Sequence, residues 1–279
     1  MLVEIAIGDA YGAGFEYAPA SWIQQWNSGS SYVDHPRHRQ GPGRYTDDTQ
    51  MSIAIAEAIV SGEPWTPDML AARFVDAFRR DPRMGYSKER YQLLQEVRDG
   101  QEYLQRVRTD TDTSGAAMRA GPIGVFRTIA AVREHAALQA AVTHNTPGGI
   151  QAAVAAALAA HYFLYRLGPK RQLGQFLAEI VPGPWEQPWS GRVGAQGLRS
   201  VHAAVTALMG SAGMSDLLRT CVAFSGDTDT VAAIALGAGS CAEEIEQDLS
   251  ADLYRQLEDG PYGRRFLEQL DERLMALVT

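Results

Sequence analysis

The sequence predicts an all-α protein, and three observations favour this fold class. Apolar residues recur at a spacing of three to four in most segments, as on one face of an α-helix. No stretch of four or more β-branched residues alternates with polar residues, so strands are not expected. Neither a repeat of fixed period nor a linker divides the chain. We therefore expect one compact multi-helix domain over residues 1–279.

The composition is that of an ordinary globular protein, with 46% hydrophobic and 21% charged residues. The net charge of −8 argues against a binding mode that neutralises nucleic-acid phosphates. The most apolar window, Ile150–Tyr165, is mostly alanine and falls short of the roughly 20 strongly apolar residues of a membrane helix. The N-terminus lacks the features of a signal peptide. These features predict a cytoplasmic monomer without membrane contact.

The first segments are expected to form short elements. The stretch Gly8–Glu16 holds three glycines, and we expect a first helix to end there in a turn, with Asp9 and Glu16 as solvated acids. A short helix is expected at Pro19–Asn27. The stretch Ser28–Gly43 is rich in glycine, serine, proline, histidine and arginine, which is typical of a loop.

Helix signals dominate the rest of the chain. Periodic apolar residues ended by Ser61-Gly62 predict a helix over Asp48–Val60. Three prolines predict a surface loop over Pro182–Gly194, which includes Trp185. Further helices are expected at Pro67–Arg80, Ser87–Arg98, Val125–His135, Leu138–Val142, Gly148–Leu167, Arg171–Ile180, Gly197–Met209, Ser215–Val222 and Val231–Gly239, and as a pair within Leu249–Leu277.

Two acidic motifs precede predicted helices. The first acidic motif is Tyr45–Met51, Tyr-Thr-Asp-Asp-Thr-Gln-Met, and the second is Ser225–Thr230, Ser-Gly-Asp-Thr-Asp-Thr. An Asp or Thr before a helix commonly caps it, but a cap needs a single oxygen. Each motif offers two carboxylates together with hydroxyls. Because such hard oxygen donors are ligands for Mg²⁺, Mn²⁺ or Ca²⁺ rather than zinc or copper, we expect the two motifs to meet around metal.

A small-residue loop is predicted at Thr109–Gly124. Its hydroxyls and unhindered amides are suited to cradle a pyrophosphate, although a flexible connection fits the same composition. His144, at the junction between two predicted helices, is expected from its position alone to be a structural residue.

Taken together and in order, these segments resemble the ADP-ribosylglycohydrolase family. The resemblance implies an all-α fold with a central two-metal site, holding Mg²⁺ or Mn²⁺, that hydrolyses the glycosidic bond at the anomeric carbon of ADP-ribose. The segments that carry it are Gly8–Glu16, Tyr45–Gln50, Gly115–Gly124, Thr143-His144 and Gly226–Ile234.

The same resemblance implies roles for individual residues. The implied metal ligands are Thr46, Asp47, Asp48, Asp227, Asp229 and Thr230. The implied catalytic residues are Glu16, Asp47, Asp48 and Asp227, among which the sequence does not select the general base. The implied ligand-binding residues are Gly85, Tyr86, Ser114, Gly115, Ala116, Met118 and His144. Ser114 replaces a common Asn and Ser225 a common Gly, and both should preserve the backbone course.

The resemblance implies a hydrolase that acts on ADP-ribose conjugates, with ADP-ribosylated arginine on proteins as the first choice. Serine-linked ADP-ribose and O-acetyl-ADP-ribose are alternative substrates, nucleic acid is expected only as an ADP-ribosylated substrate, and a non-catalytic ADP-ribose binder is an alternative class. Cleavage through an oxocarbenium-like state requires a carboxylate that steers a water. An isoprenoid-diphosphate enzyme is disfavoured, because Met51 and Ile234 stand where its motifs need acids.

Overall fold

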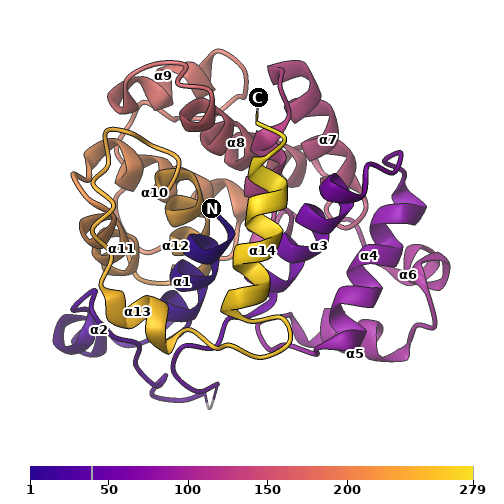
Figure 1. The fold of residues 1–279 in the computed structure, drawn as a ribbon, viewed down its shortest axis with the longest axis horizontal. Helices are drawn as coiled ribbons and strands as arrows, with labels where there is room; N and C mark the ends of the chain where they lie inside the picture. Colours follow the sequence, from indigo (N-terminus) through magenta and orange to yellow (C-terminus); the bar gives the residue numbers. More distant parts are fainter. Residues whose placement is uncertain (39, 279) are drawn as a thin grey trace.

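Two antiparallel helices at the centre of the molecule, α1 (Leu2–Ala13) and α12 (Thr228–Gly239), form the most extensive helix pair (Figure 1). A Cβ atom on Gly8 would lie 2.4 Å from the carbonyl oxygen of Ala232, and one on Gly12 would lie 2.5 Å from the backbone of α12. Only glycine permits this approach at the two positions. The pairing places the N-terminus of α12 beside the C-terminal end of α1.

The computed structural model describes residues 1–38 and 40–278, and these contain no β-strand beyond isolated bridges. The predicted all-α fold is therefore confirmed. Within this part of the chain, no helix is both long enough and apolar enough to span a membrane. The longest described helix, α8 (Pro147–Leu164), is rich in alanine and buried along most of its length.

The other helices surround the central pair. α3 (Asp47–Ser61) and α14 (Arg264–Met275) pack against α1 and against each other, whereas α10 (Gly197–Gly210) and α11 (Met214–Ala223) pack against α12. The remaining elements are α2 (Ala20–Trp26), α4 (Pro67–Arg80), α5 (Lys88–Glu96), α6 (Gly100–Arg106), η1 (Ser114–Ala116), η2 (Gly121–Val125), α7 (Ile129–Ala141), η3 (Lys170–Gln172), α9 (Leu173–Ala178) and α13 (Ala251–Gln256).

The first helix ends within Gly8–Glu16, as predicted, although only at Ala13, because Gly8 and Gly12 serve close packing inside α1. Two other helical features differ from the sequence predictions. α7 is a single helix where two segments are predicted. α6 lies where no helix is predicted, and its seven residues are too few to show a helical period. Asp99 caps its N-terminus, because the Asp99 side chain accepts a hydrogen bond from the backbone N–H of Glu102.

The proline-rich stretch Pro182–Gly194 lacks helix, as predicted, but it is anchored in the core. Trp185 is only 1% exposed, and its Nε1 donates a hydrogen bond to the backbone oxygen of Val181 at 2.7 Å. A buried indole gains apolar contact while its N–H finds an acceptor. The stretch is therefore a largely exposed loop, as predicted, but its residue Trp185 is buried.

Candidate active site

The two acidic motifs meet at one end of the central helix pair, where α3 and α12 begin. Asp47 and Asp48 come from the first turn of α3, and Asp227 and Asp229 from the start of α12. All four side chains are more than nine-tenths buried and line one cavity of about 560 Å³. Glu16, half-buried after α1, lines the same cavity. One carboxylate oxygen from each of Glu16, Asp227 and Asp229 lies within 4.8 Å of the others.

Burial and mutual repulsion make this cluster electrostatically unfavourable when all its members are ionised. Burial, followed by the charge of Asp9, raises the pKa of Asp47 and of Asp48 well above the usual range of a carboxyl. The pKa of Glu16 is raised to about 7, by burial first and then by the charges of Asp227 and Asp9. A bound cation would therefore stabilise the ionised form of these carboxylates.

The donor set fits a divalent cation of the Mg²⁺ or Mn²⁺ type, which prefers carboxylate and hydroxyl oxygens. Within the described residues, Asp48 Oδ1 is buried without a hydrogen-bond partner, although buried polar atoms generally have one. Thr230 adds a hydroxyl to the wall of the cavity. An oxygen-rich cluster that leaves a buried carboxylate oxygen unsatisfied is what a metal site requires.

Thr46 is buried directly beneath this cluster but does not line the cavity itself. Its hydroxyl donates a hydrogen bond to Asp9 Oδ1 at 2.8 Å, and its Oγ1 atom lies 3.4 Å from Asp48 Oδ2. Because a hydroxyl oxygen carries two lone pairs, donation of its proton leaves the oxygen able to bind a cation. Thr46 therefore remains compatible with its predicted role as a ligand.

Asp9 is the residue beside the site that the sequence prediction placed wrongly. It is fully buried in α1 and is not a solvated acid in a turn. It accepts hydrogen bonds from the backbone N–H and the hydroxyl of both Thr46 and Thr49, at distances between 2.6 and 3.1 Å. The glycine spacing around it, which marks a packed helix face, is the sequence signal that could have located it.

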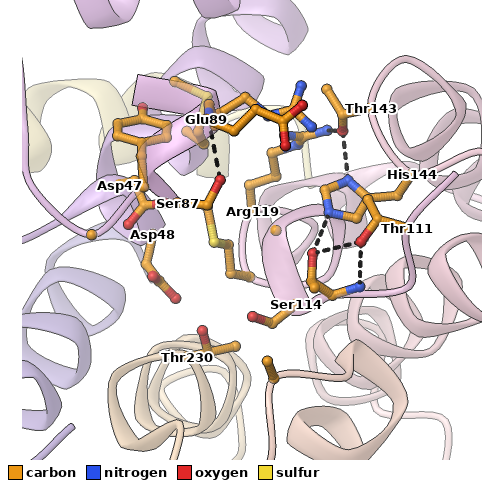
Figure 2. A pocket seen from close by; sticks show the side chains of 18 of the residues that line it. Asp47, Asp48, Ser87, Glu89, Thr111, Ser114, Arg119, Thr143, His144 and Thr230 are labelled. Carbon is orange, nitrogen blue, oxygen red and sulfur yellow. Dashed lines mark hydrogen bonds between the residues drawn. The ribbon is translucent and has the colours of Figure 1, made fainter. Parts of the chain in front are cut away.

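Three of the four residues predicted to bind the ligand in the small-residue loop line the cavity. Ser114, Gly115 and Met118 line the cavity. Ala116 does not, since it is fully buried and its backbone oxygen accepts a hydrogen bond from Gln139 Nε2 at 2.9 Å. Figure 2 shows the loop residue Ser114 and Thr230 at the wall of the same pocket, with Asp47 and Asp48 on one side and His144 on the other.

His144 lies at the wall of the cavity and is held there by two hydroxyls. Its ring nitrogens pair with Thr143 Oγ1 at 2.7 Å and with Thr113 Oγ1 at 3.0 Å (Figure 2). Burial first, and then the charges of Arg119 and Arg90, lower the pKa of His144 to about 3. His144 is therefore a neutral ring at physiological pH, suited to hydrogen bonding.

Gly85 and Tyr86 also line the cavity, on the side of the first acidic motif. Gly85 has a φ of 104°, and a Cβ atom there would lie 1.9 Å from Asp47 Oδ1. The Tyr86 hydroxyl donates a hydrogen bond to Gln50 Oε1 at 2.7 Å. Gly85 and Tyr86 therefore hold the first acidic motif in position through their contacts with Asp47 and Gln50.

Arg119 is a cavity residue that the sequence analysis did not single out. It is 3% exposed, its Nε donates to Gln139 Oε1 at 2.6 Å, and its Nη2 donates to Thr143 Oγ1 at 2.7 Å. The guanidinium also lies 4.2 Å from the ring centre of Phe74. Its position directly after Met118 in the small-residue loop is the signal that could have found it. Trp185 does not line this cavity.

The fold is thus an all-α one in which helix N-termini bring carboxylate and hydroxyl oxygens together beside a cavity of the size that binds small molecules. A sequence model of the ADP-ribosylglycohydrolases matches residues 1–279, so the chain belongs to the ADP-ribosylglycohydrolase family.

Individual relatives are distant. The ADP-ribosylhydrolase ARH3 of Xenopus tropicalis is 24% identical, and the alignment covers 84% of each chain. The ADP-ribosylarginine hydrolase Tri1 of Serratia proteamaculans is 26% identical over 133 residues, which are 45% of this chain and 35% of that protein. A solved structure described as an ADP-ribosylglycohydrolase-related protein complex matches with a TM-score of 0.77 at 20% identity, covering 100% of this chain and 96% of the other.

Proposed function

We propose that this protein is a metal-dependent hydrolase that cleaves the bond between the anomeric carbon of ADP-ribose and an acceptor. The observation that carries the proposal is the convergence of the carboxylates of Glu16, Asp227 and Asp229 within 4.8 Å, on the wall of the cavity that also holds Ser114 and His144. The proposed catalytic carboxylates and the proposed ligand-binding residues therefore line the same cavity. The proposed unit is the single domain 1–279, acting as a monomer.

The residues of the two acidic motifs would hold the metal. Two Mg²⁺ or Mn²⁺ ions bound there would balance the carboxylate charge and lower the pKa of a water. The proposed ligands are Thr46, Asp47, Asp48, Asp227, Asp229 and Thr230.

Glu16 is the proposed general base. Glu16 is only partly buried, whereas the cavity-lining carboxylates of the two acidic motifs, Asp47, Asp48, Asp227 and Asp229, are buried. A partly exposed carboxylate reaches a water in the cavity and can pass its proton on to solvent. The buried carboxylates are better placed to fix the ions.

The ligand cradle lies on the other side of the pocket. Gly115 allows close approach, since a Cβ atom there would lie 2.8 Å from His144 Cε1. The hydroxyl of Ser114 would hydrogen-bond the phosphates, and His144, whose two ring nitrogens pair with Thr143 and Thr113, would lie beside them and shape the wall of the ligand cradle. We propose ADP-ribosylated arginine as the acceptor linkage, because the relative Tri1 is an ADP-ribosylarginine hydrolase.

The test is release of ADP-ribose from three conjugates: ADP-ribosylated arginine, ADP-ribosylated serine and O-acetyl-ADP-ribose. Release is followed chromatographically with Mg²⁺, with Mn²⁺ and with a chelator. We expect release from the arginine conjugate with metal, and at least a hundredfold slower release in chelator and in Asp229→Asn. Metal-independent turnover would refute the mechanism. Tight ADP-ribose binding without turnover of any conjugate would show a binding protein instead.

A further inference from the structure

A second pocket, open to solvent and of about 440 Å³, adjoins the active-site cavity. Its walls include Tyr17, Arg37, Arg192 and Ser225, and we call it the arginine pocket. Tyr17 is the residue that lines both spaces. The two pockets therefore adjoin at Tyr17.

The arginine pocket is built on the backbone of the acidic cluster. Tyr17 directly follows Glu16, and its N–H donates a hydrogen bond to the backbone oxygen of Gly226 at 2.8 Å. Val193 donates its N–H to Ser225 and accepts one from Asp227. The segment of Val193 thus forms the partition, with Arg192 facing the arginine pocket and Ala195 facing the active-site cavity.

The two arginines are available for an anion. Neither Arg37 nor Arg192 lies within salt-bridge distance of a carboxylate of residues 1–38 and 40–278, and both are exposed. Each contacts Tyr17 instead. Arg37 donates a hydrogen bond to the backbone oxygen of Tyr17, and the Arg192 guanidinium lies 5.1 Å from the centre of its ring. Guanidinium groups present flat forks of N–H donors that match a carboxylate or phosphate.

The backbone of this pocket is strained. Three non-glycine residues of the described chain have a positive φ, and two of them, Tyr17 at 48° and Ser225 at 60°, line the arginine pocket. A left-handed conformation is unfavourable for a bulky residue such as tyrosine. Strain of this kind persists where surrounding contacts impose it and is concentrated at functional sites. The left-handed backbone at Tyr17 places this residue between the two arginines and the active-site cavity.

We propose that the arginine pocket is an acceptor-side subsite that binds the carboxylate of an Asp or Glu close to the ADP-ribosylated residue of a protein substrate. The inference rests on the proposed hydrolase function, in which ADP-ribose occupies the active-site cavity and the acceptor chain must leave past its rim. An acidic peptide is favoured over nucleic acid, because two guanidiniums on a chain of net charge −8 cannot neutralise a run of phosphates.

The test compares two peptides, each ADP-ribosylated on one arginine, that differ only in carrying Asp or Ser residues beside it. For the wild-type protein with Mg²⁺, we expect a higher kcat/KM and tighter binding by fluorescence anisotropy for the acidic peptide. Exposed ion pairs of this kind change affinity about two- to fivefold each. Arg37→Ala and Arg192→Ala should each reduce the ratio of the two kcat/KM values, and about 0.5 M NaCl should abolish it.

Arg133→Ala, which removes an exposed arginine on α7 outside both pockets, is the matched control and should keep the wild-type ratio. The Arg192→Glu variant should prefer a third peptide that carries Lys in place of Asp.

Equal kcat/KM and equal binding of the acidic and neutral peptides by the wild-type protein would overturn the subsite while leaving the hydrolase function intact. If the proposed hydrolase function is wrong, the protein would still bind the acidic peptide more tightly than the neutral one but would release ADP-ribose from neither. An arginine-dependent preference shown only by an ADP-ribosylated oligonucleotide would also overturn the proposal.

Discussion

At the scale of single residues, Asp9 organises the start of α3 although it belongs to neither acidic motif. Its carboxylate collects four donors from Thr46 and Thr49, and these donors favour its ionised form while burial opposes it. The backbone N–H groups it satisfies are among those that a helix N-terminus leaves free. Asp9 thereby fixes Asp47 and Asp48, the two proposed metal ligands that lie between its two threonines.

Thr49→Val tests this arrangement without changing charge. The substitution keeps the shape of the side chain and removes the hydroxyl that donates to Asp9 Oδ2 at 2.6 Å. Because a hydrogen bond to a charged, buried group is lost, we expect the free energy of unfolding to fall by about 1.5–3 kcal/mol in urea denaturation. Thr49→Ser retains the hydroxyl and serves as the control. Equal stability of the valine and wild-type proteins would contradict the role given to Asp9.

Gly85→Ala probes the loop that fixes Asp47. The new Cβ atom would lie 1.9 Å from Asp47 Oδ1, so the carboxylate must move. We expect Mg²⁺ affinity, measured by calorimetry, to fall at least tenfold, with a loss of stability of about 1 kcal/mol or more from the positive φ. Gly62→Ala is the matched control, since Gly62 also has a positive φ, 68°, but has no neighbour within 4 Å. It should lose stability and keep the affinity of the wild type.

Much of the candidate site could be predicted, and the exceptions have a common physical cause. Asp47 and Asp229 are recognisable because carboxylates cluster next to hydroxyls in sequence. Asp9 and Arg119 are single charges among small residues, and local sequence does not show whether such a charge meets solvent or a buried partner. Their partners, Thr46 and Gln139, lie 37 and 20 residues away. Whether a single charged residue is buried depends on the tertiary structure and therefore cannot be predicted from the neighbouring sequence.

At the scale of secondary-structure elements, the contact between α1 and α12 sets the geometry of the site. Asp9 and Glu16 come from α1 and its end, whereas Asp227 and Asp229 come from the start of α12. Their distance from one another depends on how closely the two helix axes approach. The glycines of α1 therefore act on the site through packing.

Gly8→Ala is expected to destabilise the protein in spite of the better helix propensity of alanine. The propensity gain is about 1 kcal/mol, whereas a Cβ atom 2.4 Å from the carbonyl oxygen of Ala232 forces the two backbones apart. Overpacking of this kind costs about 1–3 kcal/mol, and a backbone neighbour places it at the upper end. Thermal unfolding should show a lower Tm for Gly8→Ala. Gly210→Ala, in α10 with nothing within 4 Å, should leave the Tm equal or higher.

The same contact shows which elements the sequence could predict. Helices with strong start and stop residues were predictable, as for α4 with Pro67 at its first position and α3 with Gly62 after its last. For α1, the end was predictable only to within Gly8–Glu16, because glycine terminates helices and also permits close packing. Only the position of Ala232, more than 200 residues away, decides between these two uses of Gly8.

At the scale of the whole molecule, the fold concentrates negative charge in its interior. Asp9, Asp47, Asp48, Asp227 and Asp229 are all buried, with at most 8% of each residue exposed. Burial raises the pKa of each, so the folded metal-free protein holds these groups protonated to higher pH than the unfolded chain does. Stability of the fold is thereby coupled to proton binding, and under the proposed function it would also be coupled to metal binding.

The metal-free protein is therefore expected to lose stability as pH rises from about 4, where unfolded carboxyls titrate, through about 7, the pKa of Glu16. In this window the folded state binds more protons than the unfolded state, so the free energy of unfolding must fall with rising pH. Mg²⁺ favours the ionised carboxylates and should flatten or reverse this slope. Urea midpoints measured from pH 5 to 8, in chelator and in Mg²⁺, test the coupling. Asp229→Asn should show a shallower decline in chelator, and wild-type stability that rises with pH in chelator would contradict a buried, metal-dependent acidic cluster.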